Sequence, residues 1–413
     1  MPEHEPLEEE WSLKSIFVPF TTLKAIHWIV IIGLIVYANM LFNGFVVDDK
    51  TYIVNNSGFQ SLSFIELLKG NVFNSAGQYR PIPAMYFLFL YKTFSNISFF
   101  YHFLELILHI SNTVLLFLVF RRLFNKQIAF VLSSIFLVHP IQVESVSYIA
   151  ATDNPLFFLF GIVALYMSFK NVITNKEATA IFSLLLVSLL TKETGVLFLF
   201  IILIYKLLFN RKQFSVFLMS GIMTIIAYCI IRFGIGGIYF MKLAGVPIGG
   251  MTLMQRIINI PAIIFYYIKT LFIPFALAIN QKWVITNVTS SSFYFPLIID
   301  SAFFLLLCIA GFYVYKKNKK AFTVFMFFFL WFLAGLGMHL QLFPLDLTVA
   351  DRWFYFPLAG LLGTVGIVVQ TIKLQNKSIR TIIAVLVVIV ITSFSVITII
   401  RNTNWADNMT LYT

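Results

Sequence analysis

Charged side chains are scarce in this sequence. Lys, Arg, Asp and Glu make up 11% of the 413 residues, whereas 60% of the residues are hydrophobic, and the mean hydropathy is +0.91. Soluble domains carry about 25% charged residues, so this composition excludes an ordinary soluble protein. Apolar windows of membrane-spanning length recur along the whole chain, which predicts an all-α, polytopic membrane protein.

Cysteine is nearly absent as well. Cys229 and Cys308 both fall in apolar runs, so the sequence carries no disulfide or zinc pattern, and both thiols are expected to be packing residues. Strand-like alternation, a repeat of fixed period and low-complexity tracts are also lacking. The N-terminal stretch PEHEPLEEE is acidic and does not have the order of a cleavable signal peptide. Residues 1–24 are therefore expected to form a cytoplasmic acidic N-terminus.

What the sequence does have is a regular series of apolar segments. Residues 25–400 are expected to form one transmembrane domain of about 11 spans, with 12 as the alternative. The expected spans are 25–42, 99–120, 127–139, 148–169, 178–191, 194–209, 213–233, 297–315, 322–340, 353–371 and 380–400. Residues 82–94 are too short to span and are expected to lie in the interface or re-enter. Residues 256–278 would break the alternation of the spans, so they are expected to form a re-entrant or interfacial pair hinged near Pro274.

Basic residues account for the net charge of +12 and gather in short loops. These loops contain Arg121 and Arg122, residues 170–176, Arg211 and Lys212, and residues 316–320. This is the positive-inside pattern, which indicates topology rather than a nucleic-acid partner. It places the basic loops in the cytoplasm and residues 43–98, the first large loop, outside. Residues 401–413 are then an external tail.

The expected external loops carry unusual polar clusters. They are VVDDKTY (46–52), GQYRPIPAMYF (77–87), HPIQVESVSYIAATDN (139–154), LLTKETGV (189–196) and LDLTVADRWFYFPLAG (345–360). Each cluster alone has an ordinary explanation, such as a solvated loop, an arginine at headgroup level or an aromatic belt. Their convergence on one membrane face predicts a site for an anionic, membrane-anchored substrate.

One further cluster lies inside an expected span, in YHFLELILHISN (101–112). At helical spacing His102, Glu105, His109 and Asn112 fall within about 80° of one another. Such a stripe must face protein or water, because facing lipid is costly. A hydrogen-bond network between helices is the first interpretation. Metal ligation by Glu105 and His109 is an alternative that would need more ligands.

The order DDxxYIVNN, YRP, YHxxExxxH, HPIQVESV, KETG and DRWFYFP resembles the transmembrane and tetratricopeptide-repeat O-mannosyltransferases and their bacterial relatives, within the GT-C glycosyltransferases. The resemblance covers about residues 25–410. It implies a GT-C fold of about eleven spans, a donor sugar, typically mannose, on a polyprenyl phosphate, and a hydroxyl acceptor, usually a protein Ser or Thr. The tail RNTNWADNMTLYT resembles the junction at which the tetratricopeptide repeats of that family begin.

The resemblance also implies roles for residues. The catalytic position of the family falls on Asp48, with Asp49 beside it. The implied donor-phosphate or substrate-binding residues are Tyr79, Arg80, His102, His109, His139, Glu144, Lys192, Glu193, Asp351, Arg352 and Tyr355. No cofactor is expected; a divalent cation is the alternative, with Asp49 and Glu144 as its candidate ligands. Two positions depart from the family: Glu105 replaces an asparagine, and ATDN (151–154) lacks an expected arginine, so that Lys192, Arg80 or Arg352 would have to contact the donor phosphate.

A single inverting displacement needs one carboxylate as general base and cations to offset the charge of the leaving phosphate. Because adjacent side chains diverge in an extended chain, Asp48 is the expected base, and Asp49 is expected to orient the site or bind a cation. Transfer to a lipid or polysaccharide, a transporter or flippase, and a catalytically inactive scaffold remain alternatives. Short loops and richness in Lys, Asn, Ile and Phe favour a bacterial inner membrane, with the site on the periplasmic side.

Overall fold

The computed structural model describes residues 20–70, 77–239, 245–275, 279, 281–372 and 376–412. Within these residues the chain is helical, and the one β-bridge, between Gln281 and Val349, is isolated. The helices are α1 (Thr22–Tyr37), α2 (Ser57–Gln60), α3 (Pro81–Phe94), α4 (Ser98–Leu123), α5 (Lys126–Val138), α6 (Val143–Ser147), α7 (Asp153–Ser168), α8 (Asn175–Thr191), α9 (Val196–Phe209), α10 (Arg211–Cys229), α11 (Leu253–Phe272), α12 (Phe295–Lys317), α13 (Lys319–Gly337), α14 (Tyr355–Thr371), α15 (Lys377–Thr403) and α16 (Asn408–Tyr412). The protein is therefore an all-α polytopic membrane protein, as its composition predicts.

In the described parts of the chain, eight helices are long and apolar enough to cross a membrane. They cover Thr22–Phe42, Ser98–Leu123, Ile149–Ser168, Arg211–Ile235, Ser290–Lys317, Lys319–Gly337, Asp351–Thr371 and Lys377–Thr403. A ninth span forms if α5 and the segment Pro140–Ser147, which meet at 51°, count as one. Each of the eleven expected spans falls on a helix, but α8 and α9 have only 17 and 14 residues. The number of crossings stays a prediction.

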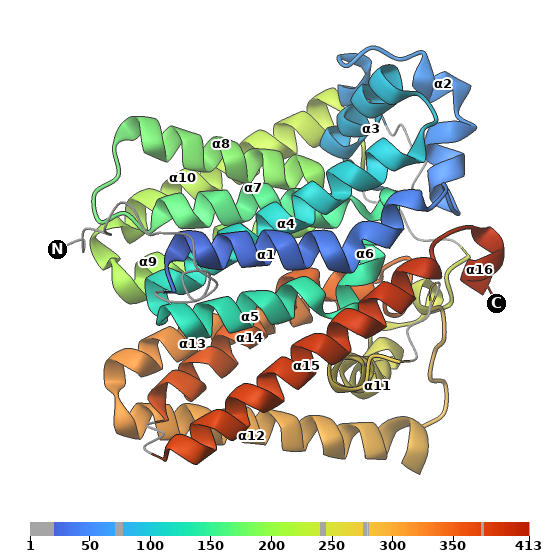
Figure 1. The fold of residues 1–413 in the computed structure, drawn as a ribbon. Coiled ribbons are helices and arrows are strands. Elements are labelled where there is room, and N and C mark those ends of the chain that lie inside the picture. The colour runs from blue at the N-terminus through green and yellow to red at the C-terminus, as the bar shows by residue number, and fades with distance from the viewer. Residues whose placement is uncertain are drawn as a thin grey trace, which may run out of the picture.

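The helices run back and forth between two ends of a bundle. Figure 1 shows the N-terminal end of α1 at one end, together with the connections from α7 to α8, from α9 to α10 and from α12 to α13. These three connections correspond to the basic loops at residues 170–176, at Arg211 and Lys212, and at residues 316–320. The opposite end carries α2, α3 and α16 (Figure 1) and the junctions that contain the polar clusters. The basic loops and the polar clusters thus lie at opposite ends of the bundle, while the side of the membrane that each end faces stays a prediction. Most of the acidic N-terminus, residues 1–19, lies outside the described residues.

Helix α11 lies across the bundle rather than along it. Figure 1 shows α11 along its own axis, whereas α1, α12 and α15 extend across the view. This orientation suits the predicted interfacial segment and leaves the alternation of the spans intact. The predicted pair hinged near Pro274 is not seen: one helix of 20 residues ends at Phe272, and residues 276–278 lie outside the described residues.

Close approach of α13 and α14 forms the centre of the core. Gly360 and Gly363 of α14 face Phe332 and Phe328 of α13, where an added Cβ would overlap these residues. Small residues at such contacts allow transmembrane helices to pack by van der Waals contact. By contrast, Cys308 is exposed on α12, so the expectation that it packs inside the protein is wrong; a thiol in an apolar run fits a lipid-facing position equally well.

Candidate active site

Asp48 and Asp49 lie where the chain leaves the first span and turns into a short helix. Asp49 has a helical backbone, with φ −56° and ψ −43°, and opens the π-helical turn η2 (Lys50–Val54). The extended chain expected here is therefore wrong. The side chains nevertheless diverge, because successive residues on a helix point about 100° apart. Asp48 is partly exposed and lines a cavity, whereas Asp49 is fully buried.

The buried carboxyl group of Asp49 fixes the backbone around it. Its Oδ2 accepts a hydrogen bond from the N–H of Val46 at 3.0 Å, and its Oδ1 accepts one from the N–H of Ala150 at 2.7 Å. Burial raises the pKa of Asp49 to about 8, against the opposing effect of these two hydrogen bonds. A carboxyl group that keeps its proton at neutral pH cannot accept another, so this environment favours Asp48 as the base and gives Asp49 an orienting role.

The residue before the two aspartates is strained. Val47 has a positive φ of 43°, a conformation that is a genuine outlier for a β-branched residue. Such backbone conformations cost of the order of 1–3 kcal/mol and persist only where the surroundings impose them. The N–H of Val47 donates to Asn408 Oδ1 at 2.9 Å, and the N–H of Asp48 donates to Tyr148 Oη at 3.3 Å. The position of Asp48 is thus held by residues far away in the sequence.

A polar cavity of about 280 Å³ opens beside Asp48. Three cationic side chains, Arg80, Lys192 and Arg352, line it together with three carboxylates. The complete lining is Asp48, Tyr52, Gln78, Arg80, Pro83, Phe87, Tyr148, Ala150, Asp153, Lys192, Asp346, Arg352 and Trp353. The cations proposed to replace the missing family arginine therefore converge on one space.

Arg80 and Lys192 are held by the same carboxylate. Arg80 Nη1 lies 2.6 Å from Asp153 Oδ2, and Lys192 Nζ lies 3.4 Å from the same oxygen. Lys192 also donates to Asn154 Oδ1 at 2.5 Å. Burial lowers the pKa of Lys192 to about 8; Asp153 opposes this shift, and the charges of Arg80 and Arg352 add to it. Lys192 is therefore a buried cation near two further cations as well as Asp153, and an anionic ligand would stabilise its charged form.

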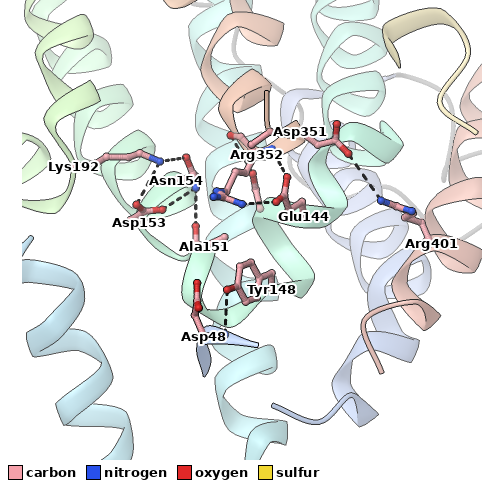
Figure 2. A network of polar contacts seen from close by, with 12 residues as sticks. Asp48, Glu144, Tyr148, Ala151, Asp153, Asn154, Lys192, Asp351, Arg352 and Arg401 are labelled. Atoms are coloured by element: carbon pink, nitrogen blue, oxygen red, sulfur yellow. Dashed lines mark hydrogen bonds and ion pairs between the residues drawn. The ribbon is translucent and has the colours of Figure 1, made fainter. Parts of the chain in front are cut away.

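Arg352 belongs to a second group on the other side of the network. It forms an ion pair with Glu144 through its guanidinium group, and its backbone N–H donates to Glu144 Oε2 at 2.9 Å. In Figure 2, Lys192, Asp153 and Asn154 lie on one side, Glu144 and Arg352 on the other, and Asp48 with Tyr148 below them. Glu144 and Arg352 also line a small pocket of about 30 Å³ that adjoins Asp48.

Several predicted site residues support these groups from behind the cavity. Glu193 accepts from the N–H of Tyr79 at 3.2 Å and from Arg80 Nε at 3.3 Å. The hydroxyl group of Tyr79 donates away from the cavity, to the carbonyl of Leu68. Asp351 accepts from Tyr266 Oη at 2.6 Å and lies 4.0 Å from Arg401, as Figure 2 also shows. These residues hold the lining in place rather than form it.

The polar stripe of α4 faces the protein, as its spacing predicts. His102, Glu105, His109 and Asn112 are all fully buried. His109 hydrogen-bonds Tyr355 Oη at 2.9 Å, and Asn112 donates to the same oxygen at 3.1 Å. None of these residues lines the cavity. His109 and Asn112, together with Glu105, which contacts Tyr86 Oη at 3.4 Å, form hydrogen bonds between helices.

His139 also lies away from the cavity. Its Nδ1 accepts from the N–H of Ile141 at 3.2 Å and its Nε2 contacts the carbonyl oxygen of Leu271 at 3.0 Å. His139 therefore caps the turn after α5 and links that turn to α11. A substrate contact for this residue, as for His102, His109 and Tyr355, stays a prediction.

Sequence reasoning missed Asp346, Gln78 and Arg232. Asp346 and Gln78 line the cavity yet stand in no motif; only their place inside the polar clusters could have indicated them. Arg232 is buried, and its Nη1 lies 3.0 Å from Glu193 Oε1. A lone charge near the end of an apolar run was the available signal, since intramembrane charges pair with one another. Trp353, an aromatic residue of the cluster at 345–360, also lines the cavity.

Asp49 and Glu144, the candidate ligands for a divalent cation, are engaged elsewhere. The oxygens of Asp49 accept backbone N–H groups, and those of Glu144 contact Arg352. Within the described ranges no group of three or more His, Cys, Asp or Glu side chains is arranged to hold a metal ion. The cavity thus offers positive side chains for an anion, with two partly exposed carboxylates, Asp48 and Asp346, beside them.

The chain is similar in sequence to proteins that are named protein O-mannosyl-transferases. A protein O-mannosyl-transferase of Caenorhabditis elegans is 24% identical over 399 residues, which are 92% of this chain and 56% of that protein. The human protein O-mannosyl-transferase TMTC3 is 28% identical over 199 residues, 45% of this chain and 22% of its own length. A protein O-mannosyl-transferase of Drosophila melanogaster is 27% identical over 177 residues, 40% of this chain and 20% of its own.

The chain thus spans about half the length of the worm protein, and the matches to the other two cover about a fifth of theirs. No protein-family model matches the chain, and no solved structure matches it. The match to the worm protein covers nearly the whole chain, so it includes the segments that form the cavity. The resemblance of this chain to the protein O-mannosyl-transferases is confirmed.

Proposed function

We propose that this protein is a GT-C glycosyltransferase that moves a sugar, most simply mannose, from a polyprenyl-phosphate donor to the hydroxyl group of a protein Ser or Thr. The names of its relatives support the reaction class. The observation that carries the proposal is the cavity in which Asp48 lies together with Arg80, Lys192 and Arg352. One carboxylate and several cations are what a displacement at a sugar phosphate requires.

The reaction then proceeds in one step at Asp48. The acceptor oxygen forms a bond to the anomeric carbon while the bond from that carbon to the phosphate oxygen breaks. The acceptor proton passes to Asp48, and the polyprenyl phosphate leaves with the electron pair of the broken bond. Arg80, Lys192 and Arg352 offset the charge that develops on the leaving phosphate. No second carboxylate is needed, and the anomeric configuration inverts.

The paired carboxylates give the cations their positions. Asp153 holds Arg80 and Lys192, and Glu144 holds Arg352. Groups fixed in advance need not reorganise during the reaction, which is the main source of electrostatic catalysis. The divalent cation stays an alternative, which an assay with and without a chelator tests directly.

Transport of the same lipid is less favoured. A transporter needs polar groups along the membrane path, whereas the polar stripe of α4 is buried, and its His109 and Asn112 bond Tyr355 of α14. Towards the basic end of the bundle, α4 packs through Phe120 and Phe124 against Phe328 of α13. We place the cavity on the side of the membrane opposite the basic loops, which in a bacterial inner membrane is the periplasmic side.

The test is sugar transfer by Asp48→Asn, with Glu66→Gln, at an exposed carboxylate outside the cavity, as the matched control. Purified protein in detergent would receive a short-chain polyprenyl-phosphate mannose and either a Ser/Thr-rich peptide or a lipid hydroxyl as acceptor. We expect Asp48→Asn to lose roughly 10²–10⁴-fold in kcat and to bind the donor as tightly as the parent protein does. Full activity in folded Asp48→Asn would refute the role of Asp48, and product on the lipid alone would change the acceptor class.

A further inference from the structure

The last residues of α15 and the segment after it fold back onto the loop that carries Asp48. Asn43 Nδ2 donates to the carbonyl of Asn402 at 2.9 Å, and the N–H of Gly44 donates to the carbonyl of Ala406 at 2.8 Å. The N–H of Val47 donates to Asn408 Oδ1 at 2.9 Å. We call residues 402–408 the tail clamp. These contacts join positions about 360 residues apart in the sequence, at the end of the bundle where α16 lies (Figure 1).

The tail clamp also reaches Asp48 from its other side. Trp405 is buried and stacks on Tyr148, with ring centroids 5.0 Å apart and an interplanar angle of 24°. Tyr148 Oη in turn accepts from the N–H of Asp48 at 3.3 Å. Trp405 lines the small pocket that Asp48 and Tyr148 share. The clamp therefore contacts the backbone before Asp48 directly and the backbone of Asp48 through Tyr148.

Asn402, the first residue of the tail clamp, is anchored in the helix bundle. The side chain of Asn402 is buried; its Nδ2 donates to the carbonyl of Val36 at 3.1 Å, and its Oδ1 accepts from Ser147 Oγ at 2.9 Å. Asn402 thus connects α15 with the end of α1 and with α6. Because Asn402 fixes the start of the tail clamp to these helices, the clamp holds the loop that carries Asp48 in place relative to the bundle.

Val47 shows why the loop needs such a support. Its positive φ of 43° is unfavourable for a β-branched side chain, and such conformations persist only where surrounding contacts impose them. The contact to the N–H of this strained residue comes from Asn408. Without that acceptor, the loop is free to relax towards an ordinary backbone conformation, and Asp48 would move with it.

We propose that the tail clamp is part of the active site and that Asn408 is a positioning residue, which holds Val47 in its strained conformation so that Asp48 faces the cavity. The proposal rests on the proposed function only for its effect on turnover. The effect on the loop itself can be measured without any substrate.

The first experiment is hydrogen–deuterium exchange of the whole protein in detergent. We expect Asn408→Ala to accelerate exchange at the amides of Asp48 and Asp49, which do not bond Asn408 themselves, as well as at Val47. Asn376→Ala is the matched control, because Asn376 accepts from the N–H groups of Ser378 and Ile379 at the opposite end of α15. Faster exchange at Val47 alone would mean that Asn408 caps one amide and positions nothing, which would overturn the proposal.

The second experiment is turnover with short-chain polyprenyl-phosphate mannose. Misplacing a catalytic group by about 1 Å costs on the order of a hundredfold, so we expect Asn408→Ala to lower kcat by roughly ten- to a hundredfold, with KM for the donor within about twofold. Asn408→Asp keeps an acceptor oxygen and should retain most of the activity. Val47→Gly, which removes the steric strain, should restore part of the kcat lost in Asn408→Ala.

The two experiments distinguish the positioning role of Asn408 from the proposed transferase function. If the parent protein has no transferase activity but Asn408→Ala still accelerates amide exchange at residues 48 and 49, the proposed function is refuted. The role of Asn408 in holding the loop is then still supported. If turnover of Asn408→Ala equals that of the parent protein, Asn408 does not position Asp48. An equal loss in Asn408→Asp and Asn408→Ala would also refute the role of the acceptor oxygen.

Discussion

Lys192 is expected to make donor binding depend on pH. Burial lowers its pKa to about 8, so the side chain is mostly charged at neutral pH and becomes neutral as the pH rises through that value. The cavity then loses one of its three cations. A polyprenyl-phosphate sugar is a phosphodiester and keeps its single negative charge over this range. Affinity for the donor should therefore fall with rising pH because Lys192 loses its charge, whereas the charge of the donor does not change.

The size of the effect follows from the fraction of charged Lys192. With a pKa of about 8, this fraction is about nine-tenths at pH 7 and about one-tenth at pH 9. If the charged form alone binds the phosphate well, the apparent Kd rises about tenfold between these two pH values. A hydrogen bond to a charged group contributes about 1.5–3 kcal/mol, so Lys192→Met should weaken binding at neutral pH by roughly ten- to a hundredfold.

The assay is donor binding to detergent-solubilised protein at constant ionic strength, measured from about pH 6 to about pH 10, a range that covers the reference lysine pKa. Lys192→Met should give a weak and flat profile above pH 7. Asp49 titrates in the same range, since burial raises its pKa to about 8. Asp49→Asn is therefore the matched control and should keep the pH dependence of the parent protein.

Two results would refute this reasoning. A pH profile that persists in Lys192→Met would assign the titration to another group. Unchanged affinity in a folded Lys192→Met variant would show that the phosphate does not contact this side chain, although Lys192 lines the cavity. In that case Arg80 and Arg352 would have to bind the phosphate without it.

Three further substitutions test the surroundings of the cavity. Arg352→Lys replaces the guanidinium group that pairs with Glu144, and because the compact ammonium group of lysine does not reproduce the planar geometry of guanidinium, we expect kcat to fall about tenfold or more; transfer equal to the parent protein would contradict this. Arg232→Met removes a buried charge that pairs with Glu193 and should lower the free energy of unfolding by about 1.5–3 kcal/mol. This loss would be measured as a lower thermal midpoint. Donor affinity should change less than in Lys192→Met. Gly195→Ala places a Cβ 2.5 Å from a backbone carbonyl oxygen of α8, so it should displace the turn between α8 and α9 and weaken donor binding; wild-type affinity would mean that the turn adapts at no cost.

The membrane architecture followed from periodicity and composition. A bilayer requires about 20 apolar residues per crossing helix and satisfies the backbone within each helix, so the apolar segments could be located without knowing their neighbours. The stripe of His102, Glu105, His109 and Asn112 was likewise predictable, because one helix alone decides which side chains share a face. The basic loops and the polar clusters separated to opposite ends for the same local reason.

The ion pairs between residues far apart in the sequence could not be predicted. The pairing of Asp153 with Arg80 and Lys192 joins three helix junctions, and nothing in their sequence positions excluded Glu144 or Asp351 as the partner. The prediction that Asp48 and Asp49 diverge was right, but it rested on an extended chain, and the structure has a helical turn there. Arg232 and Asp346 were missed because each is a single charge without a motif.

The sequence by itself determined that this is a polytopic helical membrane protein, which polar clusters share a face, and which enzyme family it resembles. Each of these properties is local, or a sum of local ones. Only the tertiary structure decided that Asp48 faces the cavity while Asp49 is buried, that three cations line the same space, and that residues 402–408 support the strained Val47. Those outcomes depend on the packing of helices far apart in the chain, which fixes each side chain through contacts that no single segment contains.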